Sequence, residues 1–225
     1  LLLDIFSEDE NILKEIKGKI VSSLVEEIKA NISLFSSFFK IQSERTDAQI
    51  VSSRSSIINR AKKLVTDTKS DLNKLKKAVG EENYEFSNLV NEIYTFVNVS
   101  VIICFNKEMD SLNKNIQFLN LYKITEKNPI YPSFKLYVDI LEEASKAISS
   151  INCPVKQTIS SNLQAIKKAH VESQKRKREQ SSYQDSRRST YSGGSTYSES
   201  RNTDSNFGGY IIAVIVFIFI LGMCN

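Results

Sequence analysis

Residues 51–79 read VSSRSSIINRAKKLVTDTKSDLNKLKKAV, and this stretch decides the fold class. A branched apolar residue recurs in it every seven positions, at Val51, Ile58, Val65, Leu72 and Val79, with Ala61, Thr68 and Leu75 as companions three positions on. This spacing places one side of an α-helix against a partner, as in a coiled coil. Several companions are small or polar, so the stretch favours packing within a helical bundle over an isolated coiled coil.

A second amphipathic helix is predicted before this stretch. Ser7-Glu8-Asp9-Glu10 has the form of a capping box with acids in the first turn, where the helix dipole favours negative charge. Apolar side chains then recur at intervals of three or four as far as about Lys40, at Ile12, Ile16, Ile20, Leu24, Ile28, Ile32, Phe35 and Phe39. That period is typical of one buried face of a long helix.

A third helix is predicted after Gly80, which is a natural C-terminal stop for the 51–79 helix. Its apolar positions are Phe86, Leu89, Ile93, Val97, Val101, Cys104, Leu112, Ile116 and Leu119. Residues 95–105 within it are β-branched and apolar enough for a strand. The surrounding helical period favours a helix that is buried on most of its circumference, and it would be the most buried element of the chain.

Two further helices are predicted beyond the break at Pro129 and Pro132, since proline restricts its own residue and the one before it. One is expected to start after a cap at Ser133, and the other follows Cys153-Pro154. Their apolar faces are Tyr137, Leu141, Ala144, Ile148 and Ile151 in the first and Val155, Ile159, Leu163 and Ile166 in the second. The sequence therefore predicts an all-α antiparallel bundle of four to five long helices over residues 1–178.

The composition changes after residue 178. Residues 179–209 are rich in Ser, Tyr and Arg and lack the apolar residues that build a core, so they are predicted to form a disordered stalk. Residues 210–225 begin with an uncharged apolar run, YIIAVIVFIFILGMC, and are predicted to be a hydrophobic membrane anchor. At about 1.5 Å per residue the run spans about 22 Å, which is short against a hydrocarbon core of about 30 Å.

Three kinds of anchorage remain open. The run, a polar spacer and the small residues around Ser198 fit a glycosylphosphatidylinositol (GPI) attachment signal, with Ser198 as a possible attachment residue. A short transmembrane helix behind a signal peptide is the second reading, and Leu1-Leu2-Leu3 would be either the end of that peptide or helix-packing residues. The third is a tail-anchored cytosolic protein, for which Arg187, Arg188 and Arg201 lie on the expected flank.

Two covalent features are expected only for an extracellular chain. Cys104 and Cys153 are a possible disulfide pair, with two reduced, buried thiols as the alternative. N-glycosylation sequons begin at Asn31 and Asn98, but each lies on or near an apolar helix face, so at most one is expected to carry a glycan.

Motifs for catalysis, cofactors and metals are not found in the sequence. The one histidine, His170, lies among Lys167, Lys168 and Glu172 and is expected to be a solvated helical side chain. A non-enzymatic protein without cofactor or metal is therefore predicted. The run Lys175, Arg176, Lys177 and Arg178 is a basic patch, most simply a solvated helix end, and the rest of the chain carries no net charge that would favour nucleic acid.

The function expected from these features is binding or presentation of a protein or lipid ligand by a membrane-anchored helical protein at the cell surface. One alternative is a tail-anchored cytosolic adaptor or tether on an organelle membrane. A further alternative is a helical lipid-binding or membrane-lytic protein that uses residues 95–105. The membrane is the only partner that the sequence indicates directly, through residues 210–225.

Overall fold

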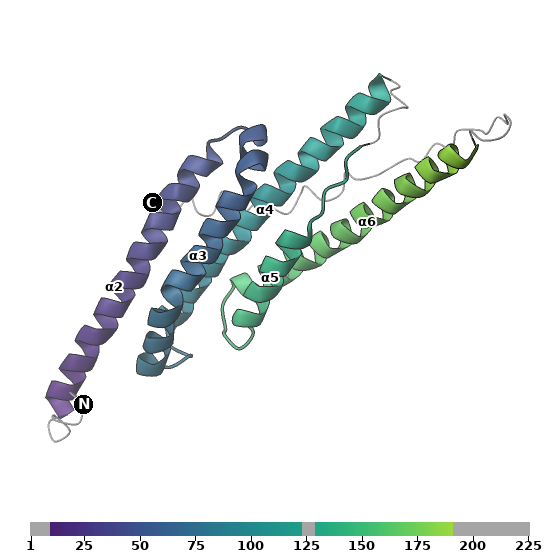
Figure 1. Cartoon of the computed structure of the whole chain (residues 1–225). Coiled ribbons are helices and arrows are strands. Elements are labelled where there is room, and N and C mark those ends of the chain that lie inside the picture. Colours follow the sequence, from purple (N-terminus) through teal and green to yellow (C-terminus); the bar gives the residue numbers. More distant parts are fainter. Residues whose placement is uncertain (1–9, 123–128, 191–225) are drawn as a thin grey trace. The chain divides into compact units, whose positions relative to one another are not determined.

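The computed structural model describes residues 10–122 and 129–190, and these residues form five α-helices without a strand (Figure 1). The helices are α2 (Glu10–Ser43), α3 (Asp47–Val79), α4 (Tyr84–Leu121), α5 (Lys135–Ala147) and α6 (Val155–Thr190). The predicted all-α class is confirmed. The predicted cap at Ser7 and the anchor at 210–225 lie outside the described residues.

The described residues divide into two compact units. The first contains residues 10–101 and 140–161, and the second contains residues 102–122, 129–139 and 162–190. Helices α4, α5 and α6 each contribute residues to both units. Each unit is described separately below.

Helices α2 and α3 form a tight hairpin in the first unit (Figure 1). Thr46 is the N-cap of α3: its side-chain oxygen accepts from the backbone N–H of Gln49, and the Gln49 side chain accepts from the backbone N–H of Thr46 at 3.0 Å. This reciprocal arrangement is a capping box, which satisfies backbone donors that the first helical turn leaves without partners. The sequence analysis placed polar residues here but did not identify the cap.

Removing this cap gives a first testable prediction. Thr46→Ala is expected to lower the free energy of unfolding by about 1 kcal/mol, the usual effect of losing an N-cap side chain. The matched control is Thr66→Ala on the exposed side of α3, where the hydroxyl only donates to the Lys62 carbonyl of its own helix at 3.1 Å. Urea unfolding of the full chain in maltoside micelles, followed by circular dichroism, measures both; equal effects of the two substitutions would contradict the capping role.

The apolar stripe predicted for α2 is only partly buried. Its buried members begin near the middle of the helix, at Leu24, Ile28, Ile32 and Phe35, joined by Val25, whereas Ile12 and Ile20 are 39% and 46% exposed. For Ile12 the reason is the length of the neighbouring helix. Arg60 of α3 stacks over the Phe38 ring at 5.3 Å, which in an antiparallel hairpin places Ile20 opposite Ala78, one residue before α3 ends at Val79. The residues before Ile20 therefore extend past the end of α3.

The α3 heptad is confirmed in part, because α3 buries a wider stripe than a single seam. Ile58, Ala61, Thr68 and Leu75 are buried as predicted, and a second column of buried side chains adds Ile50, Ile57 and Leu64. Val65 and Leu72 are only half-buried. A helix that contacts neighbours on two sides buries two adjacent columns, whereas a two-stranded coiled coil buries one.

Helix α4 is a continuous helix, so the helical interpretation of residues 95–105 is confirmed over the strand alternative. Most of its predicted apolar positions are buried, including Ile93, Val101 and Cys104, each at 0% exposure. Within the described residues it is the one helix that is long and apolar enough to cross a membrane. Most of its apolar window is buried inside the protein, however, and a core helix meets the same criteria.

The turn between α5 and α6 is fixed to the first half of α4 by polar contacts of the first unit. The Ser87 hydroxyl donates to the Asn152 carbonyl at 2.6 Å, and the Asn91 side chain accepts from the Val155 backbone N–H at 2.9 Å, which caps the start of α6. Both side chains reach a segment more than 60 residues away along the chain. These are contacts that local sequence patterns do not indicate.

The second unit is held by an aromatic cluster. The Phe105 ring meets the Phe134 ring edge-on at 5.0 Å and the Tyr137 ring at 6.2 Å, and the Tyr137 hydroxyl donates to the Glu108 carboxylate at 2.8 Å. The Ser173 hydroxyl of α6 donates to the Pro132 carbonyl at 2.6 Å. These contacts join α4, the segment before α5, and α6 within the unit.

Helix α6 extends further than predicted. It was expected to end near Arg178, but it continues to Thr190, so the first residues of the predicted disordered stalk are helical. Glu, Gln, Lys and Arg are good helix formers, and Arg176–Glu172 and Lys175–Glu179 pair at i,i+4 spacing. Such local interactions sustain a helix that lacks an apolar face. The remainder of the predicted stalk, residues 191–209, lies outside the described residues.

Candidate functional site

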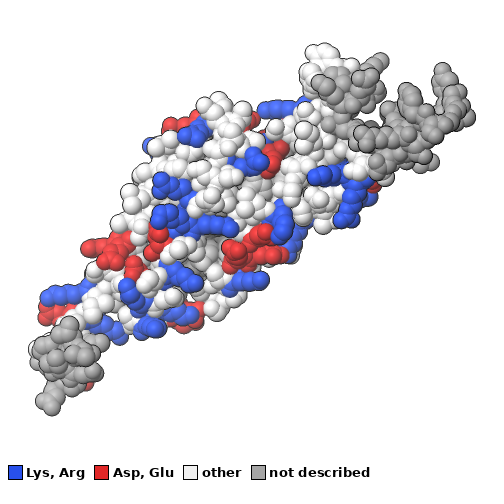
Figure 2. Space-filling view, viewed as in Figure 1, with Lys and Arg blue, Asp and Glu red and all other residues white. Residues whose placement is uncertain are grey.

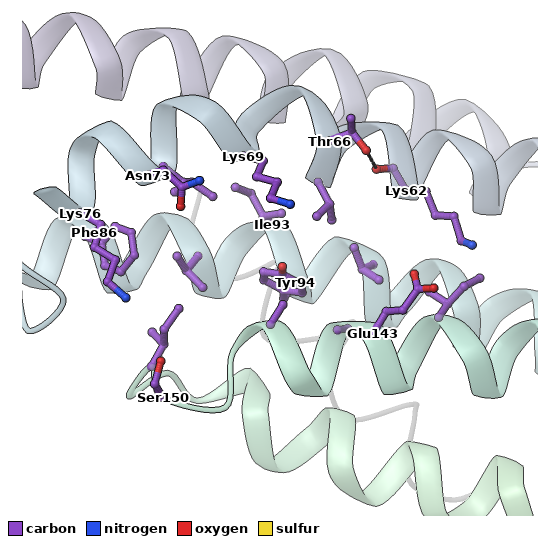
Figure 3. Close-up of a pocket in the computed structure, with 18 residues that line it drawn as sticks. Lys62, Thr66, Lys69, Asn73, Lys76, Phe86, Ile93, Tyr94, Glu143 and Ser150 are labelled. Atoms are coloured by element: carbon purple, nitrogen blue, oxygen red, sulfur yellow. Dashed lines mark hydrogen bonds between the residues drawn. The ribbon is translucent and has the colours of Figure 1, made fainter.

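A groove of about 550 Å³ lies in the first unit. We call it the α3–α5 groove, because α3 and α5 form its two sides and α4 forms its floor (Figure 3). Its volume lies within the range of small-molecule binding sites, roughly 300–1,000 Å³. Its lining residues come from segments far apart in the sequence, between Lys62 and Ile151.

The floor and the α5 side of the groove are apolar. The floor consists of Phe86, Val90, Ile93, Tyr94 and Val97 of α4, and the α5 side of Ile140, Ala144, Ala147 and Ile151. The two alanines matter because their short side chains leave space between the helices. The floor side chains are themselves 0–8% exposed, so the apolar surface that a ligand would remove from water comes mainly from the half-buried Val65 and Leu72 on the α3 side.

The α3 side of the groove carries a polar stripe. Lys62, Thr66, Lys69, Asn73 and Lys76 line it. Their spacing of three and four residues puts them on one face of the helix, beside the half-buried Val65 and Leu72. Figure 3 shows the three lysines along α3, with Glu143 and Ser150 on the opposite side of the groove. The groove therefore has an apolar floor and one cationic edge.

One end of the cationic edge is neutralised within the protein. The Lys76 ammonium pairs with the Glu81 carboxylate at 2.9 Å, and the Ser150 hydroxyl donates to the same carboxylate at 2.6 Å. The hydrogen bond from Ser150 and then that from Lys76 lower the pKa of Glu81, so this carboxylate stays ionised near neutral pH. The network joins both sides of the groove at this end.

Lys62 and Lys69 differ from their neighbours on α3. Lys63 pairs with Asp67 at 2.9 Å, and Lys74 pairs with Asp71 at 2.9 Å. Lys62 and Lys69, in contrast, have no ion-pair partner within the described part of the chain, although Lys62 is half-buried. Two groove lysines therefore retain charge that an anionic ligand would satisfy.

Tyr94 adds a hydrogen-bond donor to the groove floor. Its ring is 8% exposed, and burial raises the pKa of its hydroxyl, which therefore remains protonated at neutral pH. In Figure 3 the Tyr94 hydroxyl lies below Lys69, so the two groups face the same part of the groove. The arrangement can bind and orient a ligand, and its side chains include no nucleophile paired with a base.

The sequence analysis did not identify this groove, although part of the signal was present. Lys62, Lys69 and Lys76 repeat every seven residues, three positions before the heptad residues Val65, Leu72 and Val79. That repeat indicates a basic stripe bordering an apolar one. It does not show that α5 stands away from α3, because that distance depends on how the helices pack.

The two cysteines of the predicted disulfide are both buried, and no disulfide is present among the described residues. Cys104 is 0% and Cys153 is 5% exposed. Burial raises the pKa of the Cys153 thiol, which lowers the fraction of reactive thiolate. The disulfide is therefore not shown, and the choice between it and two reduced thiols stays a prediction.

The state of these two cysteines gives a second prediction. A full-length Cys224→Ser chain, isolated from eukaryotic cells under non-reducing conditions, is expected to take up two maleimide labels after denaturation and to label slowly when folded. Burial and the shortage of thiolate both limit the folded-state reaction. Mass spectrometry counts the labels. A chain that labels in denaturant only after reduction would instead show the predicted bridge.

The predicted glycosylation sites are poorly placed for modification. Asn98 is 5% exposed on α4. Asn31 is half-buried on α2, and its amide donates to the Glu27 carbonyl at 3.1 Å. A glycan at Asn98 would require an exposure that this fold does not provide, so Asn31 is the better of the two candidates.

The basic patch at Lys175–Arg178 is part of an ordinary charged helix surface. Arg176 donates to Glu172 at 2.9 Å, and Lys175 lies 4.0 Å from Glu179. Figure 2 shows Lys and Arg interspersed with Asp and Glu over the visible face, with no broad area of one sign. This agrees with the solvated-helix interpretation, except that the patch lies within α6 and not at its end.

His170 is less solvated than predicted. It is half-buried on α6, and its Nδ1 atom is enclosed without a hydrogen-bond partner among the described residues. No group of three or more His, Cys, Asp or Glu side chains in that part of the chain is placed to hold a metal ion. The expectation of a protein without metal or cofactor stays a prediction, as does the attachment site at Ser198, which lies outside the described residues.

Comparisons with protein-family models, curated proteins and solved structures found no match to this chain.

Proposed function

We propose that the chain is a non-enzymatic, membrane-anchored helical protein that binds a ligand in the α3–α5 groove. The observation that carries the proposal is the groove itself, about 550 Å³ of apolar-floored space whose side chains offer charge and hydrogen bonds but no catalytic pairing. The groove supports the proposed binding role. Its apolar floor favours a lipid over a polar metabolite.

The membrane part of the proposal rests on residues 210–225. The apolar run from Tyr210 to Cys224 carries no charge, and the serine-rich residues before it suit a spacer between an antiparallel helical bundle and the bilayer. In this arrangement a GPI anchor attached near Ser198 holds the bundle at the outer face of the cell membrane. Tethering would raise the local concentration of the groove beside the lipids of that membrane.

One alternative has a specific observation in its favour. Arg187, Arg188 and Arg201 precede the apolar run, as the positive-inside rule prefers for a tail-anchored cytosolic adaptor. The membrane-lytic alternative has less support, because Val97 and Val101 are 2% and 0% exposed and residues 95–105 present little apolar surface.

The test of anchorage is enzymatic release. The full-length chain, with its natural upstream sequence, is expressed in a eukaryotic cell, and intact cells are treated with phosphatidylinositol-specific phospholipase C. We expect surface labelling before treatment and release into the medium after it. A chain with its apolar run replaced by a known transmembrane helix is the matched control and should stay on the cell. Retention of the natural chain without surface labelling would overturn the extracellular proposal in favour of tail anchorage.

A further inference from the structure

We infer that the α3–α5 groove takes a single-chain amphiphile with an anionic head group, of which a long-chain fatty acid is the simplest example. The inference rests on the proposed function in one respect, that the groove is a binding site. It adds the chemical class of the ligand and the direction in which that ligand lies.

The length and volume of the groove suit one acyl chain. Lys62 and Lys76 are 14 residues apart on α3, so the cationic edge is about 21 Å long at 1.5 Å per residue. The groove has a volume of about 550 Å³, within the range of sites that bind small molecules, and a slender acyl chain suits its long and narrow form.

The charges indicate where the head group lies. Lys76 is already paired with Glu81, whereas Lys62 and Lys69 have no ion-pair partner in the described residues. Thr66 lies between them on the same helix face, and the protonated Tyr94 hydroxyl lies below Lys69 (Figure 3). A carboxylate or phosphate at this position would meet two cations and a hydroxyl donor.

About 10 Å of the groove, from Lys69 to Lys76, remains for the part of the hydrocarbon next to the head group. Beyond Lys69 toward the Lys76 end, the lining includes Leu72, Phe86, Val90 and Ile151, which are apolar. The Lys76–Glu81–Ser150 network lies at that end and joins the two sides. An acyl chain therefore points from the Lys62–Lys69 region toward Phe86. Glu143 lies opposite Lys62 (Figure 3) and repels an anion at that end, so the head group is expected on the Lys69 side of Lys62.

Photo-crosslinking of the full-length chain in phosphatidylcholine nanodiscs tests this inference. The probe is palmitate with a diazirine near its methyl end, and mass spectrometry locates the crosslinks. We expect saturable crosslinking to residues 86–97 or 140–151. Unlabelled palmitate and lysophosphatidic acid should both compete if an anionic head is what the groove recognises, and the stronger competitor identifies carboxylate or phosphate as the preferred head. Hexadecanol, which has the chain without the charge, should compete at least about tenfold more weakly, given two exposed ion pairs at a few-fold each.

Two pairs of variants separate charge from shape. Lys62→Gln with Lys69→Gln should raise the half-saturating palmitate concentration about tenfold, whereas the control Lys63→Gln with Lys77→Gln, on the same helix outside the groove, should leave it unchanged. Ala147→Phe should abolish groove crosslinks by filling the space, whereas Ala30→Phe on the exposed side of α2 should not.

The outcomes distinguish this inference from the proposed function. Crosslinking that does not saturate, or equal competition by hexadecanol, would overturn the anionic-amphiphile assignment, whether or not phospholipase releases the chain from cells. Saturable binding in nanodiscs, together with failure of phospholipase release, would leave the ligand class standing and remove the GPI anchor.

Discussion

Ile28→Ala is expected to lower the free energy of unfolding by about 3 kcal/mol, the largest effect of any single substitution considered for this chain. Ile28 is 0% exposed on α2, so truncation removes buried methyl groups and leaves a cavity that close-packed neighbours fill only in part. Leu34, less than two turns further along the same helix, is 73% exposed. Leu34→Ala should change the free energy of unfolding by no more than about 0.5 kcal/mol.

The two substitutions are comparable because isoleucine and leucine have the same atoms and both residues lie on α2, so the main difference between them is burial. Urea unfolding of the full-length chain in maltoside micelles, followed by circular dichroism, provides the comparison. Similar effects at the two positions would mean that α2 does not pack on this face. An effect at Leu34 alone would mean that the buried face of α2 has been assigned the wrong way round.

Gly80→Ala should lower the free energy of unfolding by about 2 kcal/mol, through backbone strain alone. Gly80 ends α3 with φ +90° and ψ 160°, a conformation that residues with a side chain rarely adopt. A Cβ atom at this position would meet nothing within 4 Å, so steric contact with neighbours does not contribute. The backbone N–H of residue 80 donates to the Lys76 carbonyl at 2.8 Å, and this hydrogen bond can form with glycine or with alanine at position 80.

Gly18→Ala is the matched substitution, and its expected effect on the free energy of unfolding has the opposite sign. Gly18 lies inside α2, where its φ is not positive and a Cβ would also meet open space. Alanine there should raise the free energy of unfolding by about 0.5 kcal/mol, because it reduces the backbone freedom of the unfolded chain and favours helix. The same unfolding experiment measures both. Destabilisation at Gly18, or no change at Gly80, would contradict the conformations on which the prediction depends.

The fold class was predictable because helical period is a local property. The apolar positions of α4, the turn at Gly80 and the break at Pro129 were all recognised from spacing and residue type. The predictions were wrong where contacts with other helices decide whether a side chain is buried. Ile12 and Ile20 continue the α2 stripe in the sequence but are exposed: Ile12 lies past the end of α3, and Ile20 lies opposite its last turn. The end of α6 was placed too early because loss of an apolar face was taken as loss of the helix.

The candidate site was much less predictable than the fold. Lys62 and Lys69 look in the sequence like any solvated lysines on a helix, and four other lysines in α3 resemble them. What distinguishes the two is that acidic partners satisfy Lys63, Lys74 and Lys76, while the groove leaves Lys62 and Lys69 beside an apolar floor. Ala144 and Ala147 contribute by being small, and that contribution depends on which helix stands opposite them.

The sequence by itself determined which residues are helical, where most helices begin and end, and that an uncharged apolar run occupies residues 210–224. These properties depend on residues within a few turns of each other, so their signal is local. Only the tertiary structure decided which stripes are covered, that Cys104 and Cys153 are buried, and that α3, α4 and α5 line a groove with one cationic edge. Those features depend on the relative lengths and packing of helices far apart in the chain, which no local pattern encodes.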